Sequence, residues 1–328
     1  MTGGISIGSA WRIMWRLALG LVLLIVVMLL LFRAAAAYRE RGDAVPASST
    51  LVATPLGRVA VAMSGPAAGT PVMLIPGTAG WSGFWRDVSR HLAGRGYRVI
   101  AVDLPPFGYS DRDPELRYDR AAQAQRLAAV LNTLAPARPA IVVAHSFGAG
   151  AATELALRTP AVVGRLVLVD AALGILDPAD PPASGGVIHQ PIIMQPAIAA
   201  SLTNPWALPA LMRSLLARKD AADPWIETIR QPMRRTGSTA AYAAWAPALF
   251  STNDGGWSWR SDRLTAMKPP VAIIWGEADS VTPIAQGERL AAIFDAPLQR
   301  LPGVGHIPHI EDPAHFLPAL DRAIEERP

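Results

Sequence analysis

The stretch from Ile141 to Gly150 constrains the fold of this chain more than any other. Its letters are Ile-Val-Val-Ala-His-Ser-Phe-Gly-Ala-Gly, so an apolar run typical of a buried strand leads directly into an Ala-rich, helix-forming segment. Between the two stands Ser146, with the small residues Ala144 and Gly148 two positions before and after it. A strand, a sharp turn and a helix in this order expose a serine hydroxyl beside helix N–H groups. The pattern predicts a nucleophile elbow on a parallel sheet.

Length and cysteine content limit the architecture. A chain of 328 residues has room for one large α/β domain with an insertion. The chain contains no Cys, which excludes disulfides, thiolate chemistry and cysteine-based zinc sites. We therefore expect one catalytic core with a lid.

The leader, residues 1–38, contains an apolar run over 17–32 that ends at Arg33. The run is short for a membrane span of about 20 residues. The stretch 34–37, Ala-Ala-Ala-Ala, could lengthen the helix or provide a signal-peptidase site. We favour an uncleaved single-pass anchor with the main domain on the outer side. Secretion after cleavage is the alternative.

Charge argues against a nucleic-acid partner. Arg12, Arg16 and Arg33 lie in the leader, which leaves 27 basic and 26 acidic residues from position 39 onward. A nucleic-acid footprint needs clustered basic residues, and here the arginines are dispersed over a nearly neutral body.

After a polar linker over 39–50, short apolar strands alternate with helical segments, which predicts a mostly parallel sheet covered by helices on both faces. The core is predicted over 51–170 and 268–328, and an inserted helical cap over 171–267. The expected strands are 51–54, 58–63, 72–75, 97–102, 140–143, 166–169, 271–275 and 298–301, and the expected core helices are 84–93, 120–134, 148–158, 284–294 and 313–326.

A serine nucleophile needs a base within hydrogen-bond reach and a third group that orients the base. Asp279 and His306 each follow one of the last two predicted strands, and the carboxyl ends of parallel strands meet at one edge of the sheet. The order Ser146, Asp279, His306 is that of a hydrolase triad. Asp170, which also ends an apolar strand, is the rival orienter.

Three further segments match motifs of one protein family. Together with the elbow, they make the chain resemble the α/β-hydrolase fold family over roughly 50–328. They are 74–78, similar to an oxyanion loop; 103–111, similar to a D-x-P-G-x-G-x-S segment; and 305–313, similar to a catalytic His loop. Pro76, Pro106 and Ala144 depart from the family pattern without removing a triad member. By this resemblance, backbone N–H groups of Phe147 and Thr78 form the oxyanion hole.

The resemblance implies a serine hydrolase that cleaves an apolar carboxylic ester through an acyl-enzyme. Alternatives are a C–C bond hydrolase, a haloperoxidase-like enzyme, or a membrane-tethered binding protein without turnover. We expect the substrate pocket to include Trp81, Trp206 and Trp245. No cofactor and no metal are implied, and the sequence leaves the oligomeric state open.

Overall fold

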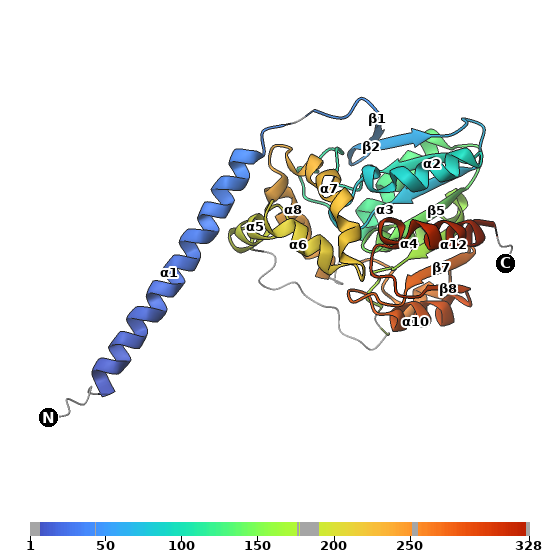
Figure 1. Cartoon of the computed structure of the whole chain (residues 1–328). Coiled ribbons are helices and arrows are strands. Elements are labelled where there is room, and N and C mark those ends of the chain that lie inside the picture. The colour runs from blue at the N-terminus through green and yellow to red at the C-terminus, as the bar shows by residue number, and fades with distance from the viewer. Residues whose placement is uncertain (1–6, 43, 176, 178–189, 251–254, 326–328) are drawn as a thin grey trace.

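An eight-stranded sheet forms the centre of the molecule (Figure 1), and its strands lie in the order β1-β2-β4-β3-β5-β6-β7-β8. The structure, a computed structural model, describes residues 7–42, 44–175, 177, 190–250 and 255–325. β1 and β2 form an antiparallel hairpin, β2 pairs antiparallel with β4, and the other neighbours are parallel. The strands are β1 (Ser49–Thr54), β2 (Gly57–Ser64), β3 (Pro71–Ile75), β4 (Arg98–Val102), β5 (Ala140–His145), β6 (Val163–Val169), β7 (Val271–Gly276) and β8 (Leu298–Leu301).

The central strands are apolar along their whole length because both faces of the sheet are covered. In β3, Val72 and Leu74 pack in the core on one face, whereas Met73 and Ile75 pack in the core on the other. This alternation follows from the period of two along a strand.

Helices cover the two faces in separate groups. Side chains of α2 (Arg86–Gly94) and α12 (Pro313–Glu325) pack into the core that contains Val72. Those of α3 (Arg120–Leu134), α4 (Gly148–Arg158) and α10 (Ile284–Phe294) pack into the opposite core.

The predicted fold class is confirmed, and each predicted strand and core helix has a counterpart. Three short helical elements next to predicted core segments were not foreseen among the described residues: the 3-10 turns η1 (Ser82–Trp85) and η2 (Pro160–Val162), and α11 (Pro308–Glu311). Glu326, where the last helix was expected to end, lies outside the described residues.

Among the described residues, five α-helices follow β6 and precede β7, and we call them the cap helices. The division of the chain into core, cap, linker and leader stays a prediction, and parts of the predicted cap lie outside the described residues. The cap helices are α5 (Pro191–Ala200), α6 (Ala207–Ser214), α7 (Ile226–Met233), α8 (Ser238–Phe250) and α9 (Ser261–Leu264).

The N-terminal helix α1 (Ile7–Arg39) projects away from the body beside α5 and α8 (Figure 1). Its Trp11–Arg39 portion is long and apolar enough to cross a membrane, by length and composition. The helix contacts α5 and α8, and Ala36 near its end is buried. The helix fits either an anchor or a signal sequence.

Candidate active site

Ser146 lies in the turn between β5 and α4 in the left-handed backbone region, with φ of 50°. Such a conformation costs a non-glycine residue roughly 1–3 kcal/mol and persists only where neighbouring contacts enforce it. The Ser146 N–H donates to the Val169 carbonyl at 3.0 Å, and its own carbonyl accepts from Ala172 N–H at 3.1 Å. A Cβ on Gly148 would lie 2.4 Å from the Pro76 carbonyl oxygen, so the turn needs glycine there.

The structure brings the three predicted triad residues together. Oγ of Ser146 lies 2.8 Å from Nε2 of His306, and Nδ1 of His306 lies 2.7 Å from Oδ2 of Asp279. All three side chains are buried. They follow β5, β8 and β7, so they meet at the carboxyl edge of the sheet. The geometry suits general-base activation of a serine, and the catalytic roles stay a prediction.

Asp279 is held by its own turn. Its Oδ1 accepts from the backbone N–H groups of Val281 at 2.7 Å and Thr282 at 3.0 Å, while Thr282 Oγ1 donates to Oδ2 at 2.6 Å. Burial alone would raise the pKa of Asp279, but hydrogen bonds from His306 and Thr282 and the nearby imidazole outweigh burial and lower the pKa. Sequence reasoning missed Thr282, although an Asp followed two and three residues later by amide donors is a familiar turn pattern.

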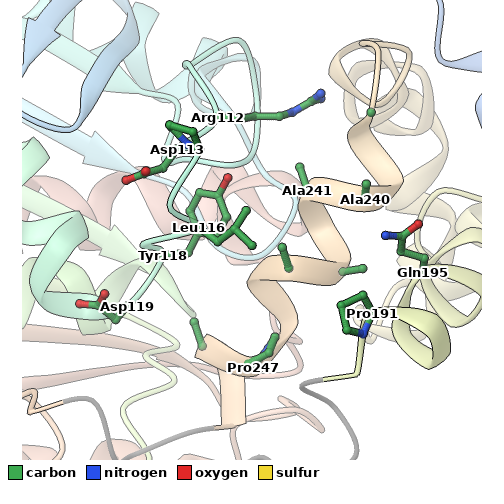
Figure 2. A pocket seen from close by; sticks show the side chains of 15 residues that line it. Arg112, Asp113, Leu116, Tyr118, Asp119, Pro191, Gln195, Ala240, Ala241 and Pro247 are labelled. Carbon is green, nitrogen blue, oxygen red and sulfur yellow. The ribbon is translucent and has the colours of Figure 1, made fainter.

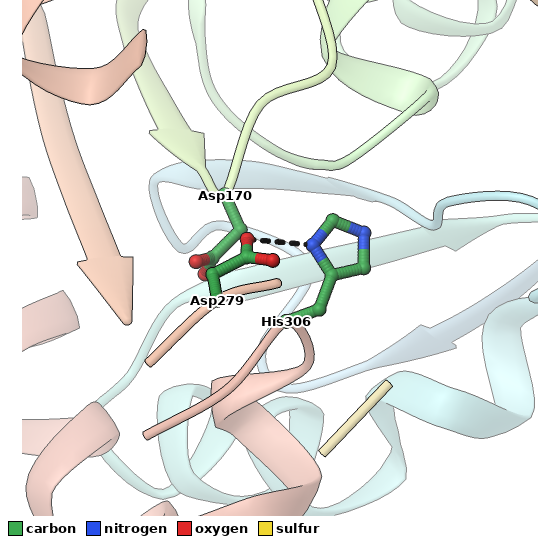
Figure 3. Close-up of side chains that lie close together, drawn as sticks. All are labelled: Asp170, Asp279 and His306. Atoms are coloured by element: carbon green, nitrogen blue, oxygen red, sulfur yellow. Dashed lines mark hydrogen bonds and ion pairs between the residues drawn. The ribbon is translucent and has the colours of Figure 1, made fainter. Parts of the chain in front are cut away.

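Asp170 lies behind Asp279 at the end of β6 (Figure 3). It is fully buried; Oδ1 accepts from Gly276 N–H at 2.9 Å, and among the described residues Oδ2 has no partner. Burial, followed by the Asp279 charge, raises the pKa of Asp170 well above its usual value, which favours the protonated carboxyl. The hydrogen bond of His306 to Asp279 favours Asp279 over Asp170 as the orienter.

Candidate ligand atoms of Asp170, Asp279 and His306 lie within 4.8 Å of one another, a spacing that a metal ion could bridge. Asp279 Oδ2, however, already faces both the His306 ring and the Thr282 hydroxyl. We therefore interpret these three residues as a hydrogen-bonded group of acid–base side chains rather than as metal ligands.

We expect Asp170→Asn to keep the triad in place, since a neutral amide replaces a neutral carboxyl. An acid whose pKa is higher in the folded than in the unfolded chain destabilises the fold as pH rises from about 4 toward the folded pKa, by at most ~1.4 kcal/mol per pH unit. The Asp170→Asn variant has no such pH-dependent loss of stability, because its amide does not ionise. Unfolding in detergent at about pH 5 and pH 8 should show the variant gaining stability over the wild type at the higher pH. An equal difference at both pH values would contradict a neutral Asp170, and exposed Asp262→Asn is the matched control.

Two other buried histidines lie close to His306, and the pKa of each is lowered. Nε2 of His145 lies 2.7 Å from the His306 carbonyl oxygen; because a carbonyl only accepts, His145 donates and holds the backbone of His306. Burial and the neighbouring His306 lower the pKa of His145 to about 3. His309 stacks on Trp85 at 4.2 Å between ring centroids, and burial lowers its pKa well below the usual value. Of these three rings, only His306 contacts a carboxylate that can stabilise an imidazolium.

The candidate oxyanion donors lie beside the nucleophile. Phe147 follows Ser146 and precedes the first residue of α4, and Thr78 lines the same cavity as Ser146. Among the hydrogen bonds of the described residues, none uses the backbone N–H of either residue. Both groups are therefore available to a substrate oxygen, and their role stays a prediction.

A cavity of about 240 Å³ opens beside Ser146 and His306. Its wall is mostly aliphatic, and α6 and the adjoining loop supply much of it. No Lys, Arg, Asp or Glu occurs among the described residues that line it. The lining residues with aliphatic or thioether side chains are Pro76, Ala172, Leu202, Leu208, Leu211, Met212, Leu215, Ile229, Leu249, Val281 and Ile307.

None of the three tryptophans expected in the pocket lines this cavity, which corrects that expectation. Trp81 Nε1 donates to the Thr228 carbonyl at 2.7 Å, so its ring serves the contact between core and cap helices. Trp245 is buried against Phe147, with ring centroids 5.0 Å apart, and Trp206 is 77% exposed on the outer surface. Tertiary packing therefore uses these rings elsewhere.

A larger cavity of about 730 Å³ lies between the 112–119 loop, α5 and α8 (Figure 2). Leu116 and Tyr118 line it from the loop and Ala241 lines it from α8. No triad residue lines this second cavity, so the smaller one is the candidate substrate pocket.

Comparison with known proteins identifies the family. A family model described as alpha/beta hydrolase fold matches residues 70–313. This chain belongs to the α/β-hydrolase family. The matched region of this α/β hydrolase contains all three triad candidates, and the family and the names of the relatives support a hydrolase.

Among the relatives of this α/β hydrolase, the 2-hydroxymuconate semialdehyde hydrolase of Pseudomonas sp. strain CF600 is 31% identical over 76% of this chain and 84% of its own length. An uncharacterised protein of Mycobacterium tuberculosis strain H37Rv is 30% identical over 81% of this chain and 77% of its own length. The fold is also similar to a crystal structure of a membrane phospholipase A described as a bacterial virulence factor, with TM-score 0.66 and 20% identity over 97% of this chain and 99% of the other.

Proposed function

We propose that this α/β hydrolase is a membrane-anchored serine hydrolase that cleaves an uncharged, apolar carboxylic ester. The observation that carries the proposal is the Ser146 hydroxyl, hydrogen-bonded to His306 at 2.8 Å and open to an aliphatic cavity. An aliphatic wall with few polar groups suits an acyl or alkyl chain, while the polar groups at one end hold the reacting carbonyl.

In the proposed reaction, Ser146 Oγ attacks the ester carbonyl and His306 Nε2 accepts the hydroxyl proton. The oxyanion accepts hydrogen bonds from the N–H groups of Phe147 and Thr78. His306 then gives the proton to the leaving alcohol, which leaves an acyl-enzyme. A water molecule, deprotonated by His306, releases the acid and restores Ser146. Asp279 holds the imidazole and stabilises its charged form.

The second candidate is hydrolysis of a C–C bond, and the similarity to 2-hydroxymuconate semialdehyde hydrolase favours it. A muconate carries a carboxylate, and burial of an unpaired carboxylate is costly. The described lining of the cavity contains no Lys or Arg to pair with such a group. The cavity therefore favours the ester over the anionic substrate, and the likeness to a membrane phospholipase A agrees with an ester.

The anchor is the preferred interpretation of α1. The helix continues without a break through 34–37, and Ala36 is only 1% exposed because it packs on the cap helices. We therefore favour retention of the helix, as part of the folded protein, over secretion after cleavage. We propose the outer side of the membrane for the main domain, as expected from the sequence.

We expect kcat/KM on p-nitrophenyl esters to rise with acyl chain length, by up to about fourfold per methylene, until the cavity is filled, because each buried methylene contributes ~0.8 kcal/mol. Esters should also react faster than 2-hydroxymuconate semialdehyde. Leu211→Asp, at the cavity wall, should flatten the chain-length dependence, whereas Met63→Asp, exposed on β2, should preserve it. Faster cleavage of the semialdehyde than of every ester would favour the C–C reaction instead.

A further inference from the structure

The end of α1 is bound to the cap helices, so the position of the anchor relative to these helices is fixed. Nε of Arg33 donates to Oε1 of Gln195 on α5 at 3.0 Å, and Nη2 of Arg39 donates to the Thr203 carbonyl at 3.3 Å. Ala36, between the two arginines, is buried. A membrane that holds α1 therefore also sets the position of α5.

The two contacts occur in the same order along both segments, since Gln195 precedes Thr203 as Arg33 precedes Arg39. Gln195 lies on α5 and Arg33 directly follows the apolar run of α1, so α5 lies beside the end of that run. Ile192 is three residues before Gln195, within one helical turn of this contact. Helices that lie in the membrane interface bury their apolar face by about 5–10 Å.

Apolar side chains on α5 and at the start of α6 are uncovered. Ile192 is 82% exposed and Ile193 is 48% exposed, and α5 contains no charged residue. Trp206, at the N-cap of α6, is 77% exposed. Tryptophan is enriched at the boundary between lipid and water. We call Ile192, Ile193 and Trp206 the docking face.

We propose that the docking face inserts into the interface of the bilayer that holds α1, and that the substrate is an amphiphilic ester taken from that bilayer. The proposal rests on the proposed ester hydrolysis and names its substrate class. Leu211, on the helix that begins after Trp206, is 38% exposed and lines the cavity beside Ser146. The pocket wall thus reaches the surface on α6, the helix whose N-cap is Trp206 of the docking face.

The insertion can be measured directly, because a chain without cysteine accepts a single labelled one. Full-length Ile192→Cys, labelled with an environment-sensitive fluorophore and reconstituted in phosphatidylcholine vesicles, should be quenched by spin-labelled lipid. Met63→Cys, on an exposed position of β2, is the matched control and should not be quenched. Equal quenching at both positions would overturn the proposal, as would a label shielded from water but not quenched by lipid, which would indicate a second protein copy on this face.

The access route is tested with two substrates and the reconstituted full-length enzyme. Ile192→Glu with Trp206→Glu should lower hydrolysis of a phosphatidylcholine ester in vesicles by about tenfold or more, because buried apolar contact with lipid is lost. Hydrolysis of soluble p-nitrophenyl butyrate should change less than about twofold, and Met63→Glu should change neither rate. Unchanged vesicle hydrolysis in the double variant would overturn the proposal. If the wild type cleaves neither ester, the proposed function fails, and the quenching experiment still decides whether the face docks.

Discussion

Replacing Ser146 with alanine should lower kcat/KM for ester hydrolysis by about 10⁴-fold or more, since removal of a triad nucleophile leaves only binding and oxyanion stabilisation. The hydroxyl faces the cavity and forms a hydrogen bond with the His306 ring, so its loss leaves the core packed. The left-handed backbone at this position is equally strained with alanine. We therefore expect unchanged unfolding and a nearly inactive enzyme.

A fluorophosphonate probe reports the same residue without a substrate. Wild type should be labelled and Ser146→Ala should not, because the probe requires an activated serine hydroxyl. Ser214→Ala, at an exposed position on α6, is the matched control and should be labelled like the wild type. Equal labelling of the Ser146 variant would remove Ser146 as the nucleophile.

The core of the fold and the positions of the triad candidates could be predicted from the sequence because both depend on local patterns. An apolar strand followed by a small-residue turn indicates the elbow at Ser146. Asp279 and His306 follow strands that are parallel neighbours, and parallel strands place their carboxyl ends at one edge. These inferences need the order of elements and no knowledge of side-chain contacts.

The pocket wall could not be predicted, because it depends on which side of each cap helix faces the core. Leu208 and Met212 turn toward Ser146, whereas Trp206 turns outward. A helix such as α8, in which apolar residues occur all round, gives no periodic signal for its buried side. The contact of Arg33 with Gln195 joins residues far apart in the chain, and neither side chain stands out in the sequence.

Asp279→Ala should lower kcat by about 10⁴-fold near neutral pH, because His306 loses the group that fixes its tautomer and stabilises its charge. The residual activity should then rise with pH. After burial, the Asp279 charge is the largest cause of the raised pKa of Asp170, so its removal lets Asp170 ionise more readily. A carboxylate of Asp170 within 4.8 Å of the imidazole can partly replace the missing one.

The double variant Asp279→Ala with Asp170→Asn tests whether Asp170 contributes to the rise of residual activity with pH. It should be less active than Asp279→Ala alone, and its activity should rise less with pH, because neither carboxyl that the described residues place near His306 remains. Asp170→Asn alone should stay close to wild type, so the coupling between the two sites appears as a non-additive change in kcat. Identical pH profiles for the single Asp279 variant and the double variant would mean that Asp170 does not act on His306. A steeper rise with pH when Asp170 is present would instead make Asp170 a reserve partner of the His306 imidazole, with a pKa that burial and the charge of Asp279 keep raised.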